Sequence, residues 1–428
     1  MRRLLLVVIM IFLFLYWLIP SKGDERDKKV FAELYSEDSI SINLSKYVKQ
    51  GVYEINDTID LQGKTWYLPP NLHLRINKGF IKNGIVFGNK THLEYRGVVF
   101  DSIRIKGNWI VPVINTSMFA NLRYENSLKD VFALSNPKIV NEIFIGEGSY
   151  YLSALSESDQ CLMIDSNTNV TIDGDIILNP NSYSGYRMIF IKGNNIVLQG
   201  KGVLVGDRDS HLGENGEWGM GIFISGGSNI TIKGIRIKDC WGDCVYIKRD
   251  ANNVIIDSCV LEKGRRQGIS VISAHNIQIK NCLFKGIGGT SPGYAIDIEP
   301  NNNDIVGNVM IDNIKVDSCI GGISGGGRKK GARVGYISVT NSYIGNTIKY
   351  PLHFVKCDSI VVENSDINVI KNDIALDCAD DECVSFIGNR IHFPDFVFAN
   401  DNQEELLNST IRIVNTREKK VNNNKVLK

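Results

Sequence analysis

The stretch from Asn229 to Asn303 repeats one short pattern three times, opening with Asn229-Ile230-Thr231-Ile232, Asn253-Val254-Ile255-Ile256 and Asn276-Ile277-Gln278-Ile279. Each opening leads to a second strand of alternating character: Val245-Tyr246-Ile247, Ile269-Ser270-Val271 and Ile296-Asp297-Ile298. The opening asparagines are 24 and then 23 residues apart. A period of this size with strand-like alternation indicates a solenoid, in which neighbouring coils bury each other's apolar faces.

Four cysteines share a local pattern in which two polar residues precede the Cys: Cys240, Cys259, Cys282 and Cys319. We expect them to stack as small core residues at one position of successive coils. Disulfide bonds are the alternative, although the total of nine Cys is odd. Neither a CxxC pair nor a His cluster accompanies them, so we expect no metal site.

The composition sets broad limits on function. A chain of 428 residues with 43% hydrophobic content can bury a large core. The formal net charge is only +1, which gives no indication of a nucleic-acid partner.

The N-terminus has the form of an export signal, because Met1-Arg2-Arg3 precedes an apolar run from Leu4 to Ile19. We interpret residues 1–22 as a cleaved signal peptide or as a retained membrane anchor, and residues 23–39 as a charged linker. Both alternatives predict an exported protein that is periplasmic, extracellular or membrane-anchored.

The remaining chain divides into three predicted parts. Residues 40–135 contain short strands and form an N-terminal β-rich region or cap, with one helix from Ser127, as N-cap, to Leu134. Residues 136–415 form the regular coils. Residues 416–428 are basic and rich in Asn, and we predict that they are a disordered tail.

The period, the Asn-opened strands and the cysteines resemble the right-handed parallel β-helix superfamily, the fold of pectate lyases, polygalacturonases and many phage tailspikes. The resemblance covers most of residues 40–415. It implies an all-β fold, a right-handed single-stranded parallel β-helix with an N-terminal cap. It also implies a polysaccharide partner, bound or cleaved along the outer face of the helix.

Outward-facing residues on adjacent coils carry the predicted site. Cations can pair with a sugar acid, carboxylates can act as acid and base, and an aromatic ring can stack on a sugar. The candidate catalytic residues are Asp243, Lys248, Arg266, Asp297 and Glu299, which we expect on one face. The candidate substrate-binding residues are Asp207, Asp209, His211, Glu217, Trp218, Tyr246, Arg265 and Gln267. The loop Gly325-Gly326-Gly327-Arg328 is interpreted as a mobile rim loop and not as a phosphate loop.

Within the superfamily, the closest local likeness is to polygalacturonase-type glycosidases. Gly242-Asp243-Cys244 is similar to their Asp-Asp-Cys strand, and Gln267-Gly268-Ile269-Ser270 to their His-Gly-x-Ser strand. Three positions depart from that pattern: Met220, Gly242 and Gln267 stand where Asp, Asp and His are expected. Only Asp243 matches a catalytic position of that family.

Several functions therefore stay open at this point. One is an enzyme that hydrolyses an acidic polysaccharide with Asp243 as acid and Asp297 or Glu299 as its partner. Another is a lyase in which Lys248 or the arginines act as base, with Ca²⁺ held by Asp297 and Glu299; an epimerase would need a similar set. The alternative is a non-catalytic carbohydrate-binding or adhesion β-helix. The concentration of charged and aromatic residues between Gly206 and Pro300 favours an enzyme.

Overall fold

The computed structural model describes residues 39, 40, 42, 48, 49, 52–370, 374–393 and 403–427. The predicted signal or anchor segment, residues 1–22, lies outside the described residues, as does the linker except for Ser39. Among the helices that are described, none has both the length and the apolar character needed to cross a membrane.

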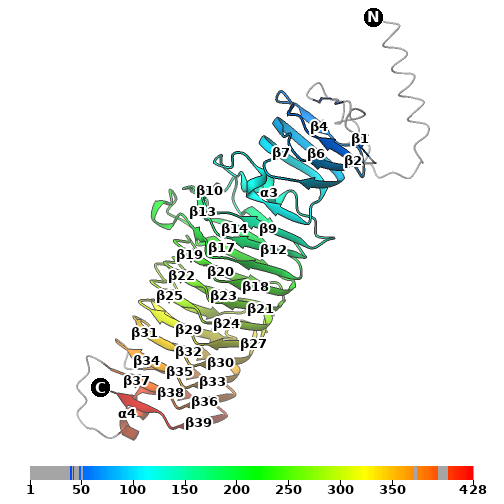
Figure 1. Cartoon of the computed structure of the whole chain (residues 1–428). Coiled ribbons are helices and arrows are strands. Elements are labelled where there is room, and N and C mark those ends of the chain that lie inside the picture. Colours follow the sequence, from blue (N-terminus) through cyan, green and yellow to red (C-terminus); the bar gives the residue numbers. More distant parts are fainter. Residues whose placement is uncertain are drawn as a thin grey trace, which may run out of the picture.

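The described chain is an elongated stack of coils, and each coil contributes one strand to each of three long parallel sheets (Figure 1). The twelve-stranded sheet contains β8 (Val113–Asn115), β9 (Asn141–Ile145), β12 (Thr168–Ile172), β15 (Ile196–Gln199), β18 (Ser228–Lys233), β21 (Ala251–Asp257), β24 (Ala274–Lys280), β27 (Ile305–Asp312), β30 (Arg333–Thr340), β33 (Cys357–Glu363), β36 (Cys383–Ile387) and β39 (Glu418–Asn422).

The other two long sheets complete each coil. The eleven-stranded sheet contains β10 (Ser149–Leu152), β13 (Asp175–Leu178), β16 (Val203–Val205), β19 (Arg236–Lys238), β22 (Val260–Glu262), β25 (Leu283–Lys285), β28 (Lys315–Asp317), β31 (Tyr343–Thr347), β34 (Asp366–Val369), β37 (Arg390–His392) and β40 (Lys425–Leu427). The ten-stranded sheet contains β11 (Asp159–Ile164), β14 (Gly185–Ile191), β17 (Trp218–Ser225), β20 (Val245–Lys248), β23 (Ile269–Val271), β26 (Tyr294–Ile298), β29 (Gly321–Gly326), β32 (Leu352–Val355), β35 (Leu376–Ala379) and β38 (Ile411–Val414).

The N-terminal region forms a separate seven-stranded sheet at one end of the stack (Figure 1). Its strands are β1 (Val48–Lys49), β2 (Val52–Ile55), β3 (Ile59–Asp60), β4 (Thr65–Tyr67), β5 (His73–Ile76), β6 (Ile81–Tyr95) and β7 (Phe100–Ile110). Apart from the antiparallel pair β1–β2, the strand pairs in this sheet are parallel.

The described residues include two short α-helices, which lie between strands of the coils. Helix α3 (Leu128–Phe132) contacts β7 and β11, and α4 (Gln403–Thr410) lies near the C-terminal end. The predicted helix at 127–134 is therefore present but shorter. Ser127 does not cap it, because its hydroxyl donates instead to the carbonyl of Leu122 at 2.5 Å.

Asparagines hold the corners between coils. Asn229, Asn253 and Asn276 have φ values of 59°, 53° and 55°, the left-handed region that Asn tolerates better than most residues. Their side-chain amides bond from coil to coil: Asn253 Nδ2 donates to Asn229 Oδ1 at 2.7 Å, and Asn229 Nδ2 donates to Asn195 Oδ1 at 3.1 Å. Asn195, Asn229 and Asn253 thus form a hydrogen-bonded ladder, whereas Asn276 Nδ2 donates to Asn252 Oδ1 at 3.0 Å.

The core lies inside the coils and consists mainly of branched aliphatic side chains. The cysteines are free thiols and are buried apart from the half-buried Cys383, as expected for core residues. The prediction that four of these cysteines stack in a single ladder is wrong, however. Cys259 and Cys282 precede β22 and β25 at one position, whereas Cys240 and Cys319 follow β19 and β28 at another. The same local pattern thus occurs both before and after strands of the eleven-stranded sheet. Cys240 follows its strand and Cys259 precedes the next one, which explains why only 19 positions separate them.

The predicted limits of the coils need correction at both ends. Strand β8 already pairs with β9 in the twelve-stranded sheet, so the regular coils begin before residue 136. The predicted disordered tail forms β39 and β40, which pair in parallel with β36 and β37. Backbone pairing there does not depend on the polar composition of the side chains, and Val426 adds a buried apolar residue to the last coil.

Candidate functional site

One line of side chains runs along the outer face of the ten-stranded sheet, one residue per coil. Parallel pairing in register places these residues opposite each other on successive strands, roughly 4.8 Å apart. We call them the outer column: Phe190, Phe223, Tyr246, Ser270, Asp297, Ser324, His353, Asp377 and Arg412. The column changes from aromatic to polar residues at Ser270, so a polar and charged face begins there.

Arg266 links carboxylates from three other coils beside this column. Its Nη1 donates to Asp243 Oδ2 at 3.0 Å, and its Nη2 donates to Glu299 Oε1 at 2.6 Å. Its Nε lies 3.7 Å from Glu217 Oε1. Burial lowers the pKa of Arg266, but the charges of Asp243 and Glu299 outweigh that effect and raise it. The guanidinium therefore stays charged and is a poor base.

Asp243 is fully buried, and its carboxylate oxygens accept hydrogen bonds from several donors. Besides Arg266, the backbone N–H of Gln267 and the hydroxyl of Ser270 donate to its carboxylate, at 3.1 and 2.8 Å. Burial raises its pKa to about 6, against the opposing charge of Arg266, so it is ionised at neutral pH. Asp243 thus fixes Arg266 in place, and the predicted role as the proton donor does not fit this environment.

Asp297 is the carboxylate with the unusual environment. It was expected to face solvent, but only 2% of its surface is exposed. Its Oδ2 accepts a hydrogen bond from Gln267 Nε2 at 2.7 Å, whereas Oδ1 has no well-formed hydrogen bond to any described residue. Burial, followed by the charge of Glu299, raises the pKa of Asp297 to about 7. The carboxyl group of Asp297 therefore titrates near neutral pH, where its protonated and ionised forms are both populated.

Glu217 and Trp218 lie at the accessible edge of this cluster. Trp218 is 45% exposed, and its ring lies 5.9 Å from the guanidinium carbon of Arg266. Lys248 lies on the same outer face, where no described carboxylate forms an ion pair with it. Four of the five predicted catalytic residues, all but Lys248, belong to the hydrogen-bond network that runs from Arg266 to Asp297.

Other predicted substrate-binding residues serve the loop that precedes β17. The side chains of Asp207 and His211 are fully buried and bond to each other at 2.8 Å. Tyr186 also donates to Asp207. His211 stacks on Trp241 at 3.8 Å, and Arg265 covers the same ring at 3.7 Å. The prediction that Asp207 and His211 face a substrate is therefore contradicted by their burial.

Three further predicted contacts need correction. Gln267 is fully buried with both ends of its amide engaged, since its Oε1 accepts from the backbone N–H of Tyr294 at 2.7 Å. Asp209 is exposed but lies near Arg208 and Lys263 instead of the Arg266 cluster. Tyr246 points outward as expected, yet stacks on Phe223 at 5.1 Å in an apolar cluster with Ile272.

Sequence reasoning missed the polar residues further along the outer column. His353 Nδ1 lies 2.9 Å from Asp377 Oδ2, and Arg412 binds Asp377 through Nε and Nη2 at 2.6 and 2.7 Å. Arg328 is exposed, and its charge acts on both Asp297 and His353. The available signal was the short alternating strand Leu352–Val355, which places His353 outward.

A calcium ion does not fit the predicted pair of ligands in this arrangement. Glu299 is bound to the guanidinium of Arg266, and Asp297 is bound to an amide N–H. Across the described residues, no group of three or more His, Cys, Asp or Glu side chains is arranged to hold a metal ion. We therefore assign no chemical step to Ca²⁺, and a calcium requirement stays a prediction of the sequence.

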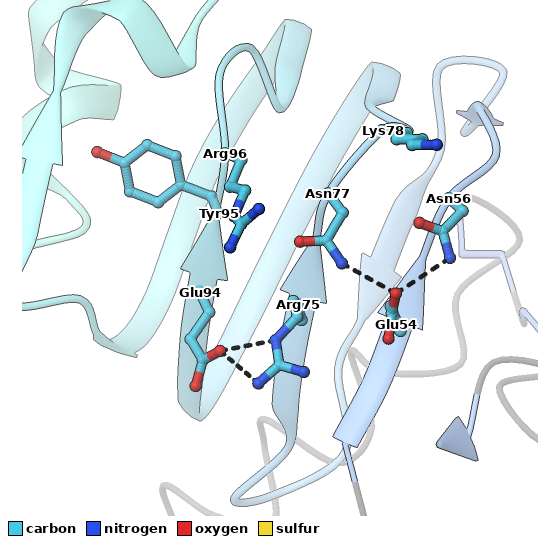
Figure 2. Close-up of a pocket in the computed structure, with 8 residues that line it drawn as sticks. All are labelled: Glu54, Asn56, Arg75, Asn77, Lys78, Glu94, Tyr95 and Arg96. Carbon is cyan, nitrogen blue, oxygen red and sulfur yellow. Dashed lines mark hydrogen bonds and ion pairs between the residues drawn. The ribbon is translucent and has the colours of Figure 1, made fainter. Parts of the chain in front are cut away.

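A separate hollow of about 720 Å³ lies on the N-terminal sheet and is lined by charged and amide side chains (Figure 2). Arg75 and Glu94 form an ion pair at 2.7 Å within it, and Asn77 donates to Glu54 at 2.9 Å. These residues come from β2, β5, β6 and the segments next to them, so the hollow is distinct from the outer column.

Comparison with known proteins identifies the coils and leaves the activity open. Residues 176–335 match the family model for a right handed beta helix region. Two curated relatives come from Bacillus subtilis (strain 168). "Uncharacterized protein YclG" is 28% identical over 37% of this chain and 32% of its own length. "SPbeta prophage-derived uncharacterized protein YorA" is 25% identical over 44% of this chain and 36% of its own length. The chain thus matches about a third of the length of each.

Two solved structures are also similar. The mannuronan C-5 epimerase AlgE6 A-module of Azotobacter vinelandii has a TM-score of 0.44 and 11% identity, over 74% of this chain and 99% of that one. The tailspike protein gp49 of Acinetobacter baumannii bacteriophage Fri1, a capsular polysaccharide depolymerase, has a TM-score of 0.41 and 14% identity, over 74% of this chain and 57% of that one. Similarity at this level says nothing of what this chain binds.

The sheet topology and the matched region together define the class of protein. The chain is a right-handed parallel β-helix protein, as its sequence pattern predicted.

The raised pKa of Asp297 has a consequence for stability. Its pKa is about 7 in the folded protein against 3.8 as the ordinary value, so the folded state binds the proton more tightly. The resulting stabilisation is full below about pH 4 and is lost as pH rises to about 7, on the order of a few kcal/mol. We expect Asp297→Asn to remove this part of the pH dependence, measured by urea unfolding between pH 4 and pH 8.

Asp358→Asn provides a matched control, because Asp358 lies on the twelve-stranded sheet in an exposed ion pair with Arg333. This control should keep the wild-type pH dependence. Equal pH dependence of stability in wild type and Asp297→Asn would show that Asp297 carries no retained proton.

Proposed function

We propose that this protein is an enzyme that hydrolyses glycosidic bonds in an acidic polysaccharide on the outer face of the ten-stranded sheet. Asp297 donates the proton to the leaving oxygen in this proposal. Hydrolysis of such a bond needs a carboxyl group that is protonated at working pH, together with a second group that acts as base.

The environment of Asp297 is the observation that carries the proposal. A buried carboxyl group with a pKa of about 7, one oxygen of which has no well-formed hydrogen bond, suits proton donation near neutral pH. Burial raises the pKa of Asp297 most, and the negative charge of Glu299, two residues further along the chain, raises it further. Arg266 in turn binds Glu299, which keeps that neighbouring charge in position.

The cations and the exposed ring indicate the kind of polymer. Arg328 and Lys248 have no ion-pair partner among the described residues, so each can pair with an acidic group of a substrate. Trp218 offers a ring for sugar stacking beside Arg266. An extended chain of sugars that includes acidic units matches these contacts better than a small compact ligand.

The reaction class follows from which groups can take up a proton. The lyase alternative used the arginines as base, but Arg266 is held between Asp243 and Glu299 and its pKa is raised. Lys248 remains the candidate base for elimination. The proton-bearing carboxyl group of Asp297 therefore supports hydrolysis better than elimination.

A non-catalytic carbohydrate-binding protein is the second candidate. Its support is the departure from the polygalacturonase pattern at Met220, Gly242 and Gln267, together with the burial of Asp297 beneath neighbouring side chains. This candidate predicts binding of the same polymers with no new ends formed.

Loss of the proton donor tests the proposed hydrolysis. Asp297→Asn should lower kcat about 10²–10⁴-fold, because an amide cannot protonate the leaving oxygen. The measurement is release of reducing ends from a panel of acidic and neutral polysaccharides, with and without Ca²⁺ and with chelator. Absorbance of unsaturated uronic acid is followed in parallel.

Asp358→Asn should keep wild-type kcat in the same assay. Reducing ends accompanied by unsaturated products would identify a lyase. Binding without any reducing ends in the wild type would instead favour the carbohydrate-binding alternative.

Arg328 should determine preference for acidic polymers. Arg328→Gln removes a cation and is expected to raise KM about tenfold on the acidic substrate, which corresponds to about 1.4 kcal/mol. KM for the same polymer after chemical reduction of its carboxyl groups should not change. Lys330→Gln in the same loop is the matched control, and an equal KM increase in both variants would speak against a specific role of Arg328.

Export is also part of the proposal, since the enzyme would encounter an intact polysaccharide substrate outside the cytoplasm. Its basis is the N-terminal pattern of residues 1–22, which lie outside the described residues. Fractionation of the producing cells is expected to place the protein in the membrane or extracytoplasmic fraction, and recovery in the cytoplasm would contradict it.

A further inference from the structure

We propose that His353 is the general base of this hydrolysis, held by Asp377 and located two coil steps from Asp297 along the outer column. This inference rests on the proposed function, since it assigns the base for the acid already named. It goes beyond the sequence prediction, which placed no catalytic role on β32 or β35.

Asp377 fixes the orientation of the imidazole. It is buried and lies 2.9 Å from His353 Nδ1. Arg412 holds both oxygens of Asp377 through paired N–H donors, which keeps this carboxylate an acceptor. A carboxylate acceptor places the proton of a neutral imidazole on Nδ1, so the lone pair is on Nε2. About 22% of the His353 side chain is exposed, which leaves it accessible to water.

The spacing along the outer column suits an acid and a base on opposite sides of a sugar. Asp297 pairs with Ser324, and Ser324 pairs with His353, so two coil steps separate acid from base. Two steps amount to roughly 10 Å between backbones. Hydrolases that invert the anomeric carbon keep their two catalytic groups about 6.5–9.5 Å apart to admit a water molecule.

The intervening strand β29 places Ser324 between the two groups, and Ser324 is fully buried. Its sequence is Gly-Gly-Ile-Ser-Gly-Gly, so Ser324 is the one outward side chain larger than hydrogen. Neighbouring side chains lie across its glycines: a Cβ at Gly321 would come within 2.3 Å of the Tyr294 ring, and one at Gly326 within 3.2 Å of Arg328 Nε. Tyr294 and Arg328 therefore lie close to the backbone of β29 at these two glycines, and at Gly326 the carbonyl oxygen of Val355 is nearer still, at 2.7 Å from such a Cβ.

The charges around His353 favour its neutral form. Burial lowers its pKa, and the nearby charge of Arg328 lowers it further, while Asp377 acts in the opposite direction. Arg412 adds to the lowering, and Tyr350 stacks on the imidazole at 5.3 Å. An imidazole that is neutral at pH 7 can accept a proton, as a base requires.

The proposed step balances in atoms and electrons. The oxygen of a water molecule bonds to the anomeric carbon while His353 Nε2 takes one proton from that water. The bond between the anomeric carbon and the glycosidic oxygen breaks, and its electron pair stays on the oxygen. Asp297 transfers its proton to this oxygen. The products are a hemiacetal of inverted configuration and an alcohol, and the two side chains return to their starting states by exchange with solvent.

The test uses the full-length protein and an acidic polysaccharide that the wild type cleaves. His353→Ala should lower kcat about 10²–10⁴-fold, and sodium azide should restore turnover as a glycosyl azide, because azide attacks without a base. Asp377→Asn should lower kcat and shift the acidic limb of the kcat–pH profile, as expected for a positioning residue. NMR at early times should show the inverted anomer from the wild type.

His392→Ala is the matched control, since His392 lies on β37 of a different sheet and should keep wild-type kcat. Thermal unfolding of each variant separates loss of fold from loss of chemistry. Retained configuration in the product, or His353→Ala with kcat within threefold of wild type while Asp297→Asn is inactive, would overturn the role of His353 and leave the proposed hydrolysis intact. Full activity of Asp297→Asn would overturn the proposed hydrolysis itself.

Discussion

Parallel pairing in register between successive coils is the constraint on which the rest of the structure depends. Each backbone hydrogen bond that joins two coils also fixes which side chains lie next to each other on the outer face. Residues far apart in sequence, such as Ser270, Asp297 and Ser324, become neighbours at the spacing of strands. The core and the asparagine ladder secure this register, so the geometry of the candidate site follows from the same repeat that builds the fold.

The fold could be predicted from sequence because the repeat is visible in single residues. Asn229, Asn253 and Asn276 mark corners that need a left-handed backbone, and branched residues between them fill the core. Local patterns misled where position within a coil mattered. Cys240 and Cys259 each follow two polar residues in sequence, but Cys240 comes after its strand and Cys259 comes before its strand. The polar composition of residues 416–428 likewise hid strands that are held mainly by backbone pairing.

The candidate site could be predicted only in part. Asp243, Arg266 and Glu299 were identified because they lie within the stretch where the period is regular. Burial could not be read from alternation, so Asp297 and Gln267 were expected to face solvent although their side chains bond to each other. His353 and Arg412 were missed because loops of varying length separate the later coils. Ser324 and His353 are 29 positions apart in the sequence, and Asp377 and Arg412 are 35 positions apart. Without a constant period, the later residues of the outer column cannot be located by counting positions along the sequence.

Arg266 joins four consecutive coils, because its partners Glu217, Asp243 and Glu299 each come from a different one. This has an evolutionary consequence for a fold that can lengthen by duplicating coils. A coil added near either end would leave the cluster unchanged. One added between Glu217 and Glu299 would move at least one partner away by roughly 4.8 Å and leave a buried charge without its counterpart. Coil number in related chains should therefore vary outside this segment and stay constant within it.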